Sequence, residues 1–322
     1  MHAPIVSPYQ SELARTPVEH RSVLVDGRTT QYWVYGSPDA RTTILAVHGF
    51  RGDHHGLESV AAQFVDDDVR TIVPDLPGFG GSDPLPVSDL DAYVRWLHGL
   101  HAALGLDRDT VVLGHSFGSI VTAATVADGL DTALLVLVNP IAAPALQGPR
   151  MVGTGIAIAY YRLGAWLPKA LGLGLLRNRG IVRAMSLAML KSREPRLRRW
   201  VHDQHDRYFS AFANRQVVLE AFRASVTHDV SEFADLVTVP VLLIAAERDD
   251  ITAVPEQRVL AARLADATLV VVPGVGHLVH YETPAAAADA IRASRPFRAD
   301  GADATDGADA TDGADATDGT DA

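Results

Sequence analysis

Short runs of β-branched and other apolar residues alternate along the chain with longer amphipathic, alanine-rich runs. This alternation is typical of a parallel sheet whose strands are joined by crossover helices. Runs such as 43–48 and 134–138 are apolar almost throughout, which predicts central strands covered by helices on both faces. Strands are expected at 21–25, 29–35, 43–48, 70–74, 110–115, 133–138, 240–245 and 268–272.

Amphipathic segments between these strands predict the crossover helices. Asp250 or Thr252, followed by Pro255, gives a start signal for the fourth of them. The helices are expected near 56–65, 88–103, 117–128, 254–265 and 285–293.

The alternation stops between about 142 and 230, where no strand pattern appears. The segment is rich in Ala, Leu and Arg and is punctuated by Pro149, Pro168 and Pro195, which predicts a set of helices inserted into an α/β domain. The expected organisation is an N-terminal extension (1–19), a core with a mostly parallel eight-stranded sheet (20–141 and 232–297), a helical insertion (142–231) and a C-terminal tail (298–322).

The net charge of −11 over 322 residues is concentrated in the tail. Residues 299–322 carry eight Asp, one at every third position from Asp300 to Asp321, and no basic residue. A DGADAT repeat with no apolar side chain larger than Ala buries too little surface to offset its ordering entropy, so disorder is expected. Both a purely solvating tail and an electrostatic interaction tail fit this composition.

A basic segment lies inside the predicted insertion. From Arg150 to Arg199 there are eleven Lys and Arg and one acid, Glu194, a net charge of +10. No helix-turn-helix pattern or aromatic-interleaved RNA motif accompanies it, and the rest of the chain is acidic. Nucleic-acid binding is therefore not expected.

The chain has no cysteine, which excludes disulfides, thiolate metal sites and a cysteine nucleophile. Its N-terminus, MHAPIVSPYQSELARTP, has neither a basic n-region nor an unbroken apolar h-region. A secretory signal is therefore not predicted, and a cytoplasmic location is expected.

The first chemical motif is G-x-S-x-G at residues 114–118, between a predicted strand and a predicted helix. A serine there sits in a sharp turn, and Gly114 and Gly118 remove side chains that would collide across it. The turn presents the hydroxyl at the carboxyl edge of the sheet, next to the positive end of a helix. Ser116 is the predicted nucleophile. The alternative is a surface serine in a Gly-rich turn with no catalytic role.

A serine nucleophile needs a base, and the late sequence GVGHLVHYETP offers two histidines. His277 follows the last predicted strand at the same sheet edge. His280 falls where the last helix should begin, so His277 is preferred.

The base in turn needs an orienting acid. The strand at 240–245 is followed by the sequence AERDD, and two adjacent aspartates cannot both point at one imidazole. Asp249 is preferred, and Asp250 is expected to cap a turn or helix. The resulting chain order is Ser, Asp, His.

With these residues, the chain resembles an α/β-hydrolase of the serine esterase and lipase type. The HGFRG sequence at 48–52 is similar to the family's oxyanion loop, which implies the backbone N–H groups of Phe50 and Phe117 as oxyanion donors. The DLPGFGGS sequence at 75–82 resembles the family's D-x-x-G-x-G-x-S loop, which is structural. Ala246 stands where the family often has Gly. A serine at the turn argues against the related epoxide hydrolases and haloalkane dehalogenases, which use Asp there.

The resemblance covers about 20–141 and 232–297 and implies a Ser-His-Asp hydrolase working through an acyl-enzyme. No metal is expected: the pairs His54, His55 and His202, His205 lack a further clustered ligand and fit ordinary polar or partly buried histidines. No G-x-G-x-x-G or P-loop lysine supports a nucleotide cofactor.

In this family the inserted segment resembles a helical cap over the active site. Residues 153–176 approach the length of a membrane span, but charges, Pro168 and glycines interrupt them. Two interpretations stay open: a lid whose Tyr160, Tyr161 and Trp166 line an acyl pocket, or a helix lying on an anionic membrane surface.

The expected substrate is a fairly hydrophobic acyl or aryl ester. C–C bond hydrolases and cofactor-free perhydrolases have a similar triad, so both activities remain alternatives to ester hydrolysis. A non-catalytic binding protein on this fold would normally show a broken triad, and all three members are present here. The sequence does not determine the oligomeric state.

Overall fold

The computed structural model describes residues 5–144, 151–294 and 297, so the predicted acidic tail lies outside the described residues. An eight-stranded sheet with the order β1-β2-β4-β3-β5-β6-β7-β8 forms its centre. β1 and β2 pair antiparallel, as do β2 and β4, and every other pair is parallel. The strands are β1 Val18–Val25, β2 Arg28–Tyr35, β3 Thr42–Val47, β4 Val69–Pro74, β5 Val111–His115, β6 Leu134–Val138, β7 Val241–Ala246 and β8 Ala267–Val272. The prediction of a mostly parallel eight-stranded sheet is confirmed.

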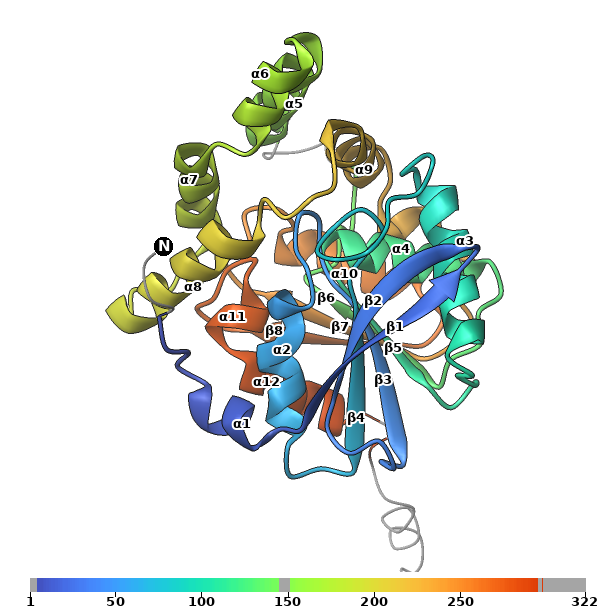
Figure 1. The fold of residues 1–322 in the computed structure, drawn as a ribbon. Helices are drawn as coiled ribbons and strands as arrows, with labels where there is room; N and C mark the ends of the chain where they lie inside the picture. Colours follow the sequence, from blue (N-terminus) through green and yellow to red (C-terminus); the bar gives the residue numbers. More distant parts are fainter. Residues whose placement is uncertain (1–4, 145–150, 295–296, 298–322) are drawn as a thin grey trace, which may run out of the picture.

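Helices cover both faces of this sheet (Figure 1). One face carries α2, η1, α11 and α12, and the other carries α3, α4 and α10. Their bounds are α2 His55–Ala61, η1 Ala62–Phe64, α3 Leu90–Ala103, α4 Phe117–Ala127, α10 Val254–Arg263, α11 Val279–Glu282 and α12 Pro284–Arg292.

The apolar runs of the central strands are explained by this arrangement. In β3, Leu45 and Val47 belong to the hydrophobic cluster under α3 and α4, whereas Ile44 and Ala46 belong to the cluster under α2 and α12. Successive side chains of a strand point to opposite faces, so a strand covered on both sides needs apolar residues at every position.

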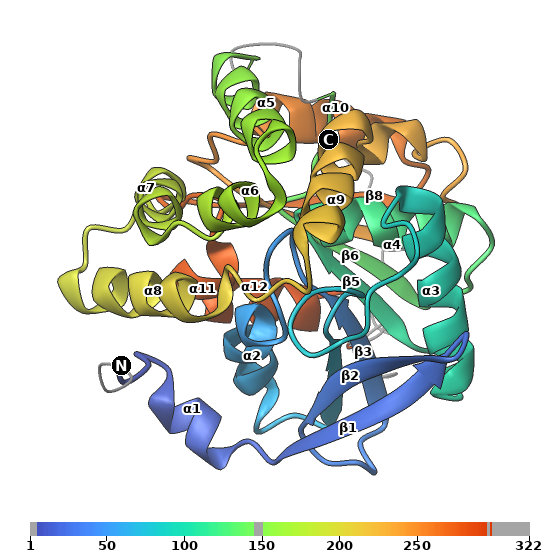
Figure 2. The same ribbon diagram turned by 45° about the horizontal axis from the view of Figure 1, so that its top comes forward.

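The segment between β6 and β7 forms helices that lie together on one side of the sheet (Figure 2). In the described part of this segment no strand occurs. Pro168 is the N-cap of α6 and separates it from α5, which divides the apolar stretch 153–176. Among the described residues, no helix is both long and apolar enough to cross a lipid bilayer. The helices are α5 Met151–Trp166, α6 Lys169–Leu176, α7 Arg179–Met189, α8 Pro195–Tyr208 and α9 Arg215–Thr227; we call them the cap helices.

Two boundaries differ from the sequence-based expectations. The first strand begins at Val18 because the whole of β1 pairs with β2, while α1 Gln10–Arg15 occupies the expected extension. Helix α10 has Ala253 as its N-cap, so a cap from Asp250 or Thr252 is wrong, whereas Pro255 lies in the first turn as predicted. The N–H of Ala253 donates to the carboxylate of Glu256 (3.1 Å). The turn before this helix is instead closed by Asp249, as described below.

The backbone is crowded at the turn between β5 and α4. Ser116 has φ 53° and ψ −117°, a conformation that L residues rarely adopt. A Cβ atom on Gly118 would lie 2.3 Å from the carbonyl oxygen of Val47, and one on Gly114 would lie 2.5 Å from the carbonyl oxygen of Gly118. Only glycine lets the helix and the two strands approach this closely.

We expect Gly118→Ala to lower the free energy of unfolding by about 1–3 kcal/mol, because the added methyl group forces backbone apart in a packed core. Gly155→Ala on α5 is the matched control: nothing lies within 4 Å of its Cβ position, and Ala favours a helix. Urea unfolding of both variants provides the comparison. Equal stabilities of the two variants would contradict the crowding argument.

Candidate active site

Ser116 lies at the carboxyl end of β5 and is the N-cap residue of α4. Its backbone N–H donates to the carbonyl of Val138 at the end of β6 (3.1 Å), and its carbonyl accepts from the N–H of Ser119 (2.9 Å). These bonds hold the strained turn from the strand side and from the helix side. The side chain is left at the helix N-terminus, where the backbone dipoles favour negative charge.

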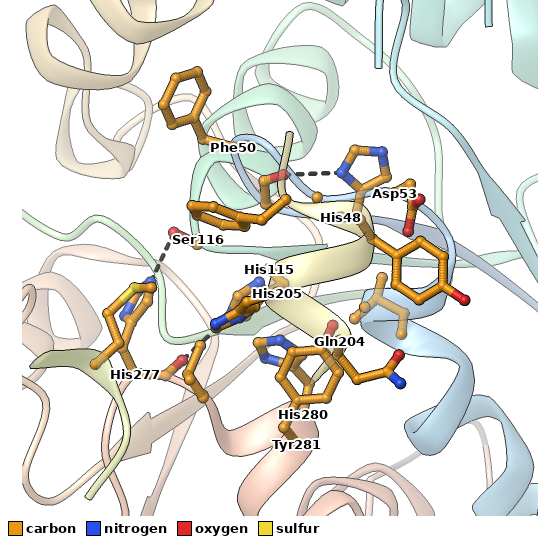
Figure 3. Close-up of a pocket in the computed structure, with 18 of the residues that line it drawn as sticks. His48, Phe50, Asp53, His115, Ser116, Gln204, His205, His277, His280 and Tyr281 are labelled. Atoms are coloured by element: carbon orange, nitrogen blue, oxygen red, sulfur yellow. Dashed lines mark hydrogen bonds between the residues drawn. The ribbon is translucent and has the colours of Figure 1, made fainter. Parts of the chain in front are cut away.

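Ser116 belongs to a continuous series of hydrogen bonds that joins three side chains. Figure 3 shows the first of these bonds, between Ser116 and His277. The Oγ atom of Ser116 lies 2.8 Å from Nε2 of His277, and Nδ1 of His277 lies 2.8 Å from Oδ2 of Asp249. An ionised carboxylate only accepts, so Nδ1 carries the imidazole proton and Nε2 accepts from the serine hydroxyl. The predicted nucleophile, base and acid are therefore placed in hydrogen-bond contact.

The loop after β7 holds the carboxylate in position. Oδ1 of Asp249 accepts hydrogen bonds from the N–H groups of Ile251 (2.7 Å) and Thr252 (3.2 Å), which leaves Oδ2 for His277. The side chains of Asp249 and His277 are buried, at 1% and 5% exposed. Burial with every partner in place keeps both groups in one geometry.

The two alternative residues, Asp250 and His280, do not take part in these hydrogen bonds. Asp250 is exposed and forms an ion pair with Lys191 of the segment after α7. The ring of His280 packs against His115, with ring centroids 4.0 Å apart, and lies away from Ser116.

Asn139 is a positioning residue that the sequence analysis missed. It follows β6 with φ 44°, its Nδ2 donates to the carbonyl of His277 (2.7 Å), and its Oδ1 accepts from the N–H of Ala246 (2.8 Å). It therefore ties the end of β7 to the loop that carries the histidine. A polar residue directly after the apolar run LLVLV, and before Pro140, was the available signal.

On its core side, the loop at 48–52 is held by the buried His48. The N–H of Leu76 donates to Nε2 of His48 (2.9 Å), so Nδ1 carries the proton and donates to the carbonyl of Gly49 (2.9 Å). Burial lowers the pKa of His48, which keeps the imidazole neutral in this role.

On the side of the cap helices, the same loop is held by Arg51, a second residue that the sequence analysis missed. Arg51 is 1% exposed and has φ 64°. Its guanidinium donates to the carbonyls of Leu176 (2.7 Å) and Phe209 (3.0 Å) and to the hydroxyl of Tyr161 (3.2 Å). No carboxylate pairs with it among the described residues, so this buried charge is stabilised by neutral oxygens of the cap helices and their connections.

Phe50 and Phe117 carry the backbone N–H groups implied as oxyanion donors. Phe50 lies between the two fixed residues of the loop, and Phe117 is the first residue of α4, whose N–H has no partner within the helix. The two rings contact each other edge to face, with centroids 6.4 Å apart. The two segments that carry these N–H groups are thus packed side by side next to Ser116.

A cavity of about 160 Å³ opens next to Ser116 and His277. Apolar side chains from the core and from the cap helices form much of its wall: Phe50, Leu57, Met185, Met189, Phe209, Ile251 and Leu278. Polar groups from α8 and α11 line another part. The cavity thus lies between the sheet edge and the cap helices.

The three cap aromatic residues predicted to line an acyl pocket are not part of this wall. The hydroxyl of Tyr160 donates to the carbonyl of Leu175, and Tyr161 stacks on Phe222 with centroids 3.8 Å apart. Both tyrosines hold cap helices together. Trp166 is 82% exposed on α5. The alternative interpretation, in which this basic segment lies on an anionic membrane surface, stays a prediction.

One group of possible metal ligands occurs among the described residues. Ligand atoms of Asp53, His54 and His55 lie within 4.8 Å of one another, so the expectation that His54 and His55 lack a further clustered ligand is wrong. Nδ1 of His54 is already bonded to Asp75 (2.9 Å), and Nδ1 of His55 is bonded to Asp53 (3.1 Å). Nδ1 of His202 and Nδ1 of His205 each lie 2.7 Å from Oγ of Ser186. Both pairs therefore have hydrogen-bond partners within the protein.

Comparison with known proteins assigns the chain to a family. Residues 44–290 match the model of the "Alpha/beta hydrolase family". The chain belongs to the α/β-hydrolase family. The resemblance inferred from the motifs is therefore confirmed, together with the fold class.

Individual relatives of this α/β-hydrolase are distant. It is 28% identical over 117 residues to Lipase 3 of Moraxella sp. (strain TA144), a match that spans 36% of each chain. It is 26% identical over 258 residues to the 2-succinyl-6-hydroxy-2,4-cyclohexadiene-1-carboxylate synthase of Salmonella typhimurium, covering 77% of this chain and 92% of the synthase. A thermophilic esterase from Thermogutta terrifontis has a similar structure, with a TM-score of 0.67, 24% identity, and coverage of 85% and 97%. At that identity the structural likeness shows the fold alone.

Proposed function

We propose that this α/β-hydrolase cleaves carboxylic esters of hydrophobic acyl or aryl substrates through an acyl-enzyme on Ser116. The observation that carries the proposal is the unbroken hydrogen-bonded chain from Ser116 through His277 to Asp249. A serine hydroxyl is a weak nucleophile until an adjacent base takes its proton, and this chain supplies the base together with a group that orients it.

In the first half of the reaction, Oγ of Ser116 attacks the ester carbonyl carbon while Nε2 of His277 takes the hydroxyl proton. The carbonyl π-bond breaks and its electron pair moves to oxygen. When the tetrahedral intermediate collapses, the C–O bond to the alcohol breaks, and the imidazolium gives its proton to the departing alkoxide oxygen. Asp249 stabilises the imidazolium through the bond to Nδ1.

In the second half, water attacks the acyl-enzyme, and the same histidine takes a proton from the water. The bond between Oγ and the acyl carbon then breaks, and His277 returns the proton to Ser116. The products are a carboxylic acid and an alcohol. Each half uses the imidazole once as base and once as acid, so the site is restored after every cycle.

The negative charge on the intermediate requires donors that are already in place. The N–H groups of Phe50 and Phe117 fill this role in the proposal. His48 and Arg51 restrain the first donor from two sides, and the helix fixes the second. A rigid pair of donors needs no reorganisation when the charge develops.

The volume of the cavity favours a small or medium-sized substrate. Its volume of about 160 Å³ is close to that of an engineered apolar cavity of about 150 Å³ that holds one benzene molecule. The apolar part of its wall suits a hydrocarbon chain or ring of about that size. Short and medium acyl groups should therefore bind with less rearrangement of the cap helices than long-chain groups.

The first test is a ladder of 4-nitrophenyl esters from acetate to palmitate, hydrolysed by the native chain and by Ser116→Ala. We expect the highest kcat/KM at a chain of about six carbons, because of the cavity volume. The serine variant should lose about 10³–10⁶-fold in kcat. A folded native protein that hydrolyses none of these esters would contradict the proposal and favour C–C bond hydrolysis or perhydrolysis on the same side chains.

The two adjacent aspartates provide a matched test of the acid. Asp249→Asn leaves a neutral amide that no longer selects the productive tautomer of His277, and we expect kcat to fall by about 10³–10⁴-fold. Asp250→Asn removes only an exposed ion pair with Lys191, so kcat should change by less than about threefold. Steady-state kinetics on the best ester measures both. The reverse ranking would show that the orienting acid is Asp250.

A further inference from the structure

The cap helices carry an exposed apolar face that the active site does not use. Ile156, Leu163 and Trp166 of α5 are between 46% and 82% exposed, and Ala159 is exposed as well. Steps of three, four and three residues place these four side chains on one face of the helix. Leu171 of the neighbouring α6 is also exposed. Large apolar side chains grouped in this way mark an interaction surface, and we call these five residues the outer face.

Close packing between α5 and α6 determines which side of α5 is exposed. A Cβ atom on Gly172 of α6 would lie 2.2 Å from the carbonyl oxygen of Gly164 on α5, so the two helices meet backbone to backbone. On the other side of α5 from the outer face, Tyr161 is buried and stacks on Phe222 of α9. The outer face is therefore held in one orientation, which reduces the entropy that docking would cost.

The outer face belongs to the periphery of the molecule. Figure 1 shows α5 and α6 projecting away from the sheet, beyond α7 and α9, and Figure 2 shows α5 again at the edge of the described chain. A projecting pair of helices can meet an extended, flat surface before the rest of the chain does.

Positive charge accompanies the outer face. Arg162 directly precedes Leu163, Lys169 lies three residues after Trp166, and both cationic side chains are exposed. No acidic residue occurs at positions 132–193, whereas eight Lys and Arg do. An anionic lipid surface matches both features, because its headgroups attract the cations and its acyl chains receive the apolar side chains. Tryptophan is also enriched where headgroups meet hydrocarbon.

A groove beside the outer face has the same mixed character. It has a volume of about 450 Å³, and α5 and α9 supply the residues of its wall. Arg162 and Arg223 line it and have no ion-pair partner in the described part of the chain. Its one acid, Glu220, accepts hydrogen bonds from the N–H of Ser88 (2.8 Å) and the amide of Gln216 (2.9 Å). The apolar part of the wall comes from Ile158, Leu219, Phe222 and Val226. The groove therefore suits an anionic headgroup and part of an acyl chain.

Two other occupants fit this surface less well. In a symmetric dimer the same patch meets itself, which would bring the cations Arg162 and Lys169 of both copies together. The acidic tail at 299–322 has the complementary charge, but it contains no apolar side chain larger than Ala and would leave the outer face uncovered.

We propose that the outer face and the adjacent groove dock the protein on an anionic phospholipid bilayer, with α5 and α6 lying among the headgroups. The contact is peripheral, because interleaved basic and apolar side chains suit the interface and not the hydrocarbon core. Of the two interpretations that the sequence left open, this is the second, and it is favoured because Tyr160, Tyr161 and Trp166 do not line the cavity at Ser116. The inference does not depend on the proposed ester hydrolysis.

The test measures flotation of the full chain with lipid vesicles, which leaves aggregated protein behind. Vesicles of phosphatidylcholine with about 30% phosphatidylglycerol are compared with vesicles of phosphatidylcholine alone, in about 50 mM and about 500 mM NaCl. At low salt we expect the native chain to bind the anionic vesicles at least about tenfold more tightly than the neutral ones. High salt should remove most of this difference, because ions screen exposed charges.

Two matched pairs of variants locate the contact. Leu171→Ser in the outer face is paired with Leu24→Ser on β1, because the two leucines are 63% and 67% exposed. Arg162→Gln is paired with Arg95→Gln on α3, which also removes an exposed arginine. We expect Leu171→Ser and Arg162→Gln each to weaken binding to the anionic vesicles about fivefold, and the two controls to change it by less than about twofold.

The fluorescence of Trp166 gives a second readout. Trp96 and Trp200 are buried and Trp33 is half-buried, so a blue shift on addition of anionic vesicles would report mainly the transfer of Trp166 out of water. Trp166→Phe keeps an aromatic side chain, so it should bind within about threefold of the native chain and lack the blue shift.

Three results would overturn the proposal: no flotation with anionic vesicles at low salt, no greater loss in Leu171→Ser than in Leu24→Ser, or a blue shift that survives Trp166→Phe. Sedimentation equilibrium without lipid tests the remaining occupant. A native dimer that Leu171→Ser dissociates would assign the outer face to a second copy of the chain and would also overturn membrane docking. Ester hydrolysis is measured without vesicles, so its success or failure leaves these outcomes unchanged.

Discussion

The rest of the site depends on one tight turn, in which Ser116 is held at φ 53° between a central strand and a helix. Such a conformation is unfavourable and persists only where the surroundings determine it. Here β6 accepts a hydrogen bond from the serine N–H, and Gly118 brings the helix against the carbonyl of Val47. The same close approach places the N–H of Phe117 beside the loop that carries Phe50. The crowded packing at the sheet edge therefore presents a half-buried hydroxyl next to the two proposed oxyanion donors.

The loop at 48–52 links this turn to the cap helices. His48 fixes the loop on the core side through neutral hydrogen bonds, and Arg51 fixes it on the cap side through carbonyls and a hydroxyl from separate segments. The rings of Phe209 and Phe212 lie under the guanidinium, 5.0 and 5.5 Å from its carbon, and add cation–π attraction. A buried charge that neutral groups stabilise from several directions is costly to misplace. The position of the cap helices and the geometry of the loop are therefore coupled.

The fold was predictable from the sequence because each central strand is a short apolar run and the segments between these runs are amphipathic or rich in alanine. The meeting of Ser116, Asp249 and His277 followed from a general rule: residues after parallel strands gather at one edge of the sheet. Arg51 and Asn139 escaped prediction because their partners lie in distant segments and their conformations are set by contacts with those segments. The positions of Tyr160, Tyr161 and Trp166, which do not line the cavity at Ser116, escaped prediction for a related reason. Helix α5 is apolar on nearly all sides, so its sequence does not specify which face turns inward.

The central claim is that Ser116 carries the acyl group during turnover, and covalent trapping tests it most directly. The native chain would be mixed with 4-nitrophenyl hexanoate, quenched in acid within milliseconds and analysed by intact-mass and peptide mass spectrometry. The account predicts a mass increase of one hexanoyl group on the peptide that contains Ser116. It also predicts no such increase in Ser116→Ala and slower formation in His277→Ala. Rapid ester hydrolysis accompanied by an acyl group on another residue, or by turnover that survives in Ser116→Ala, would contradict it.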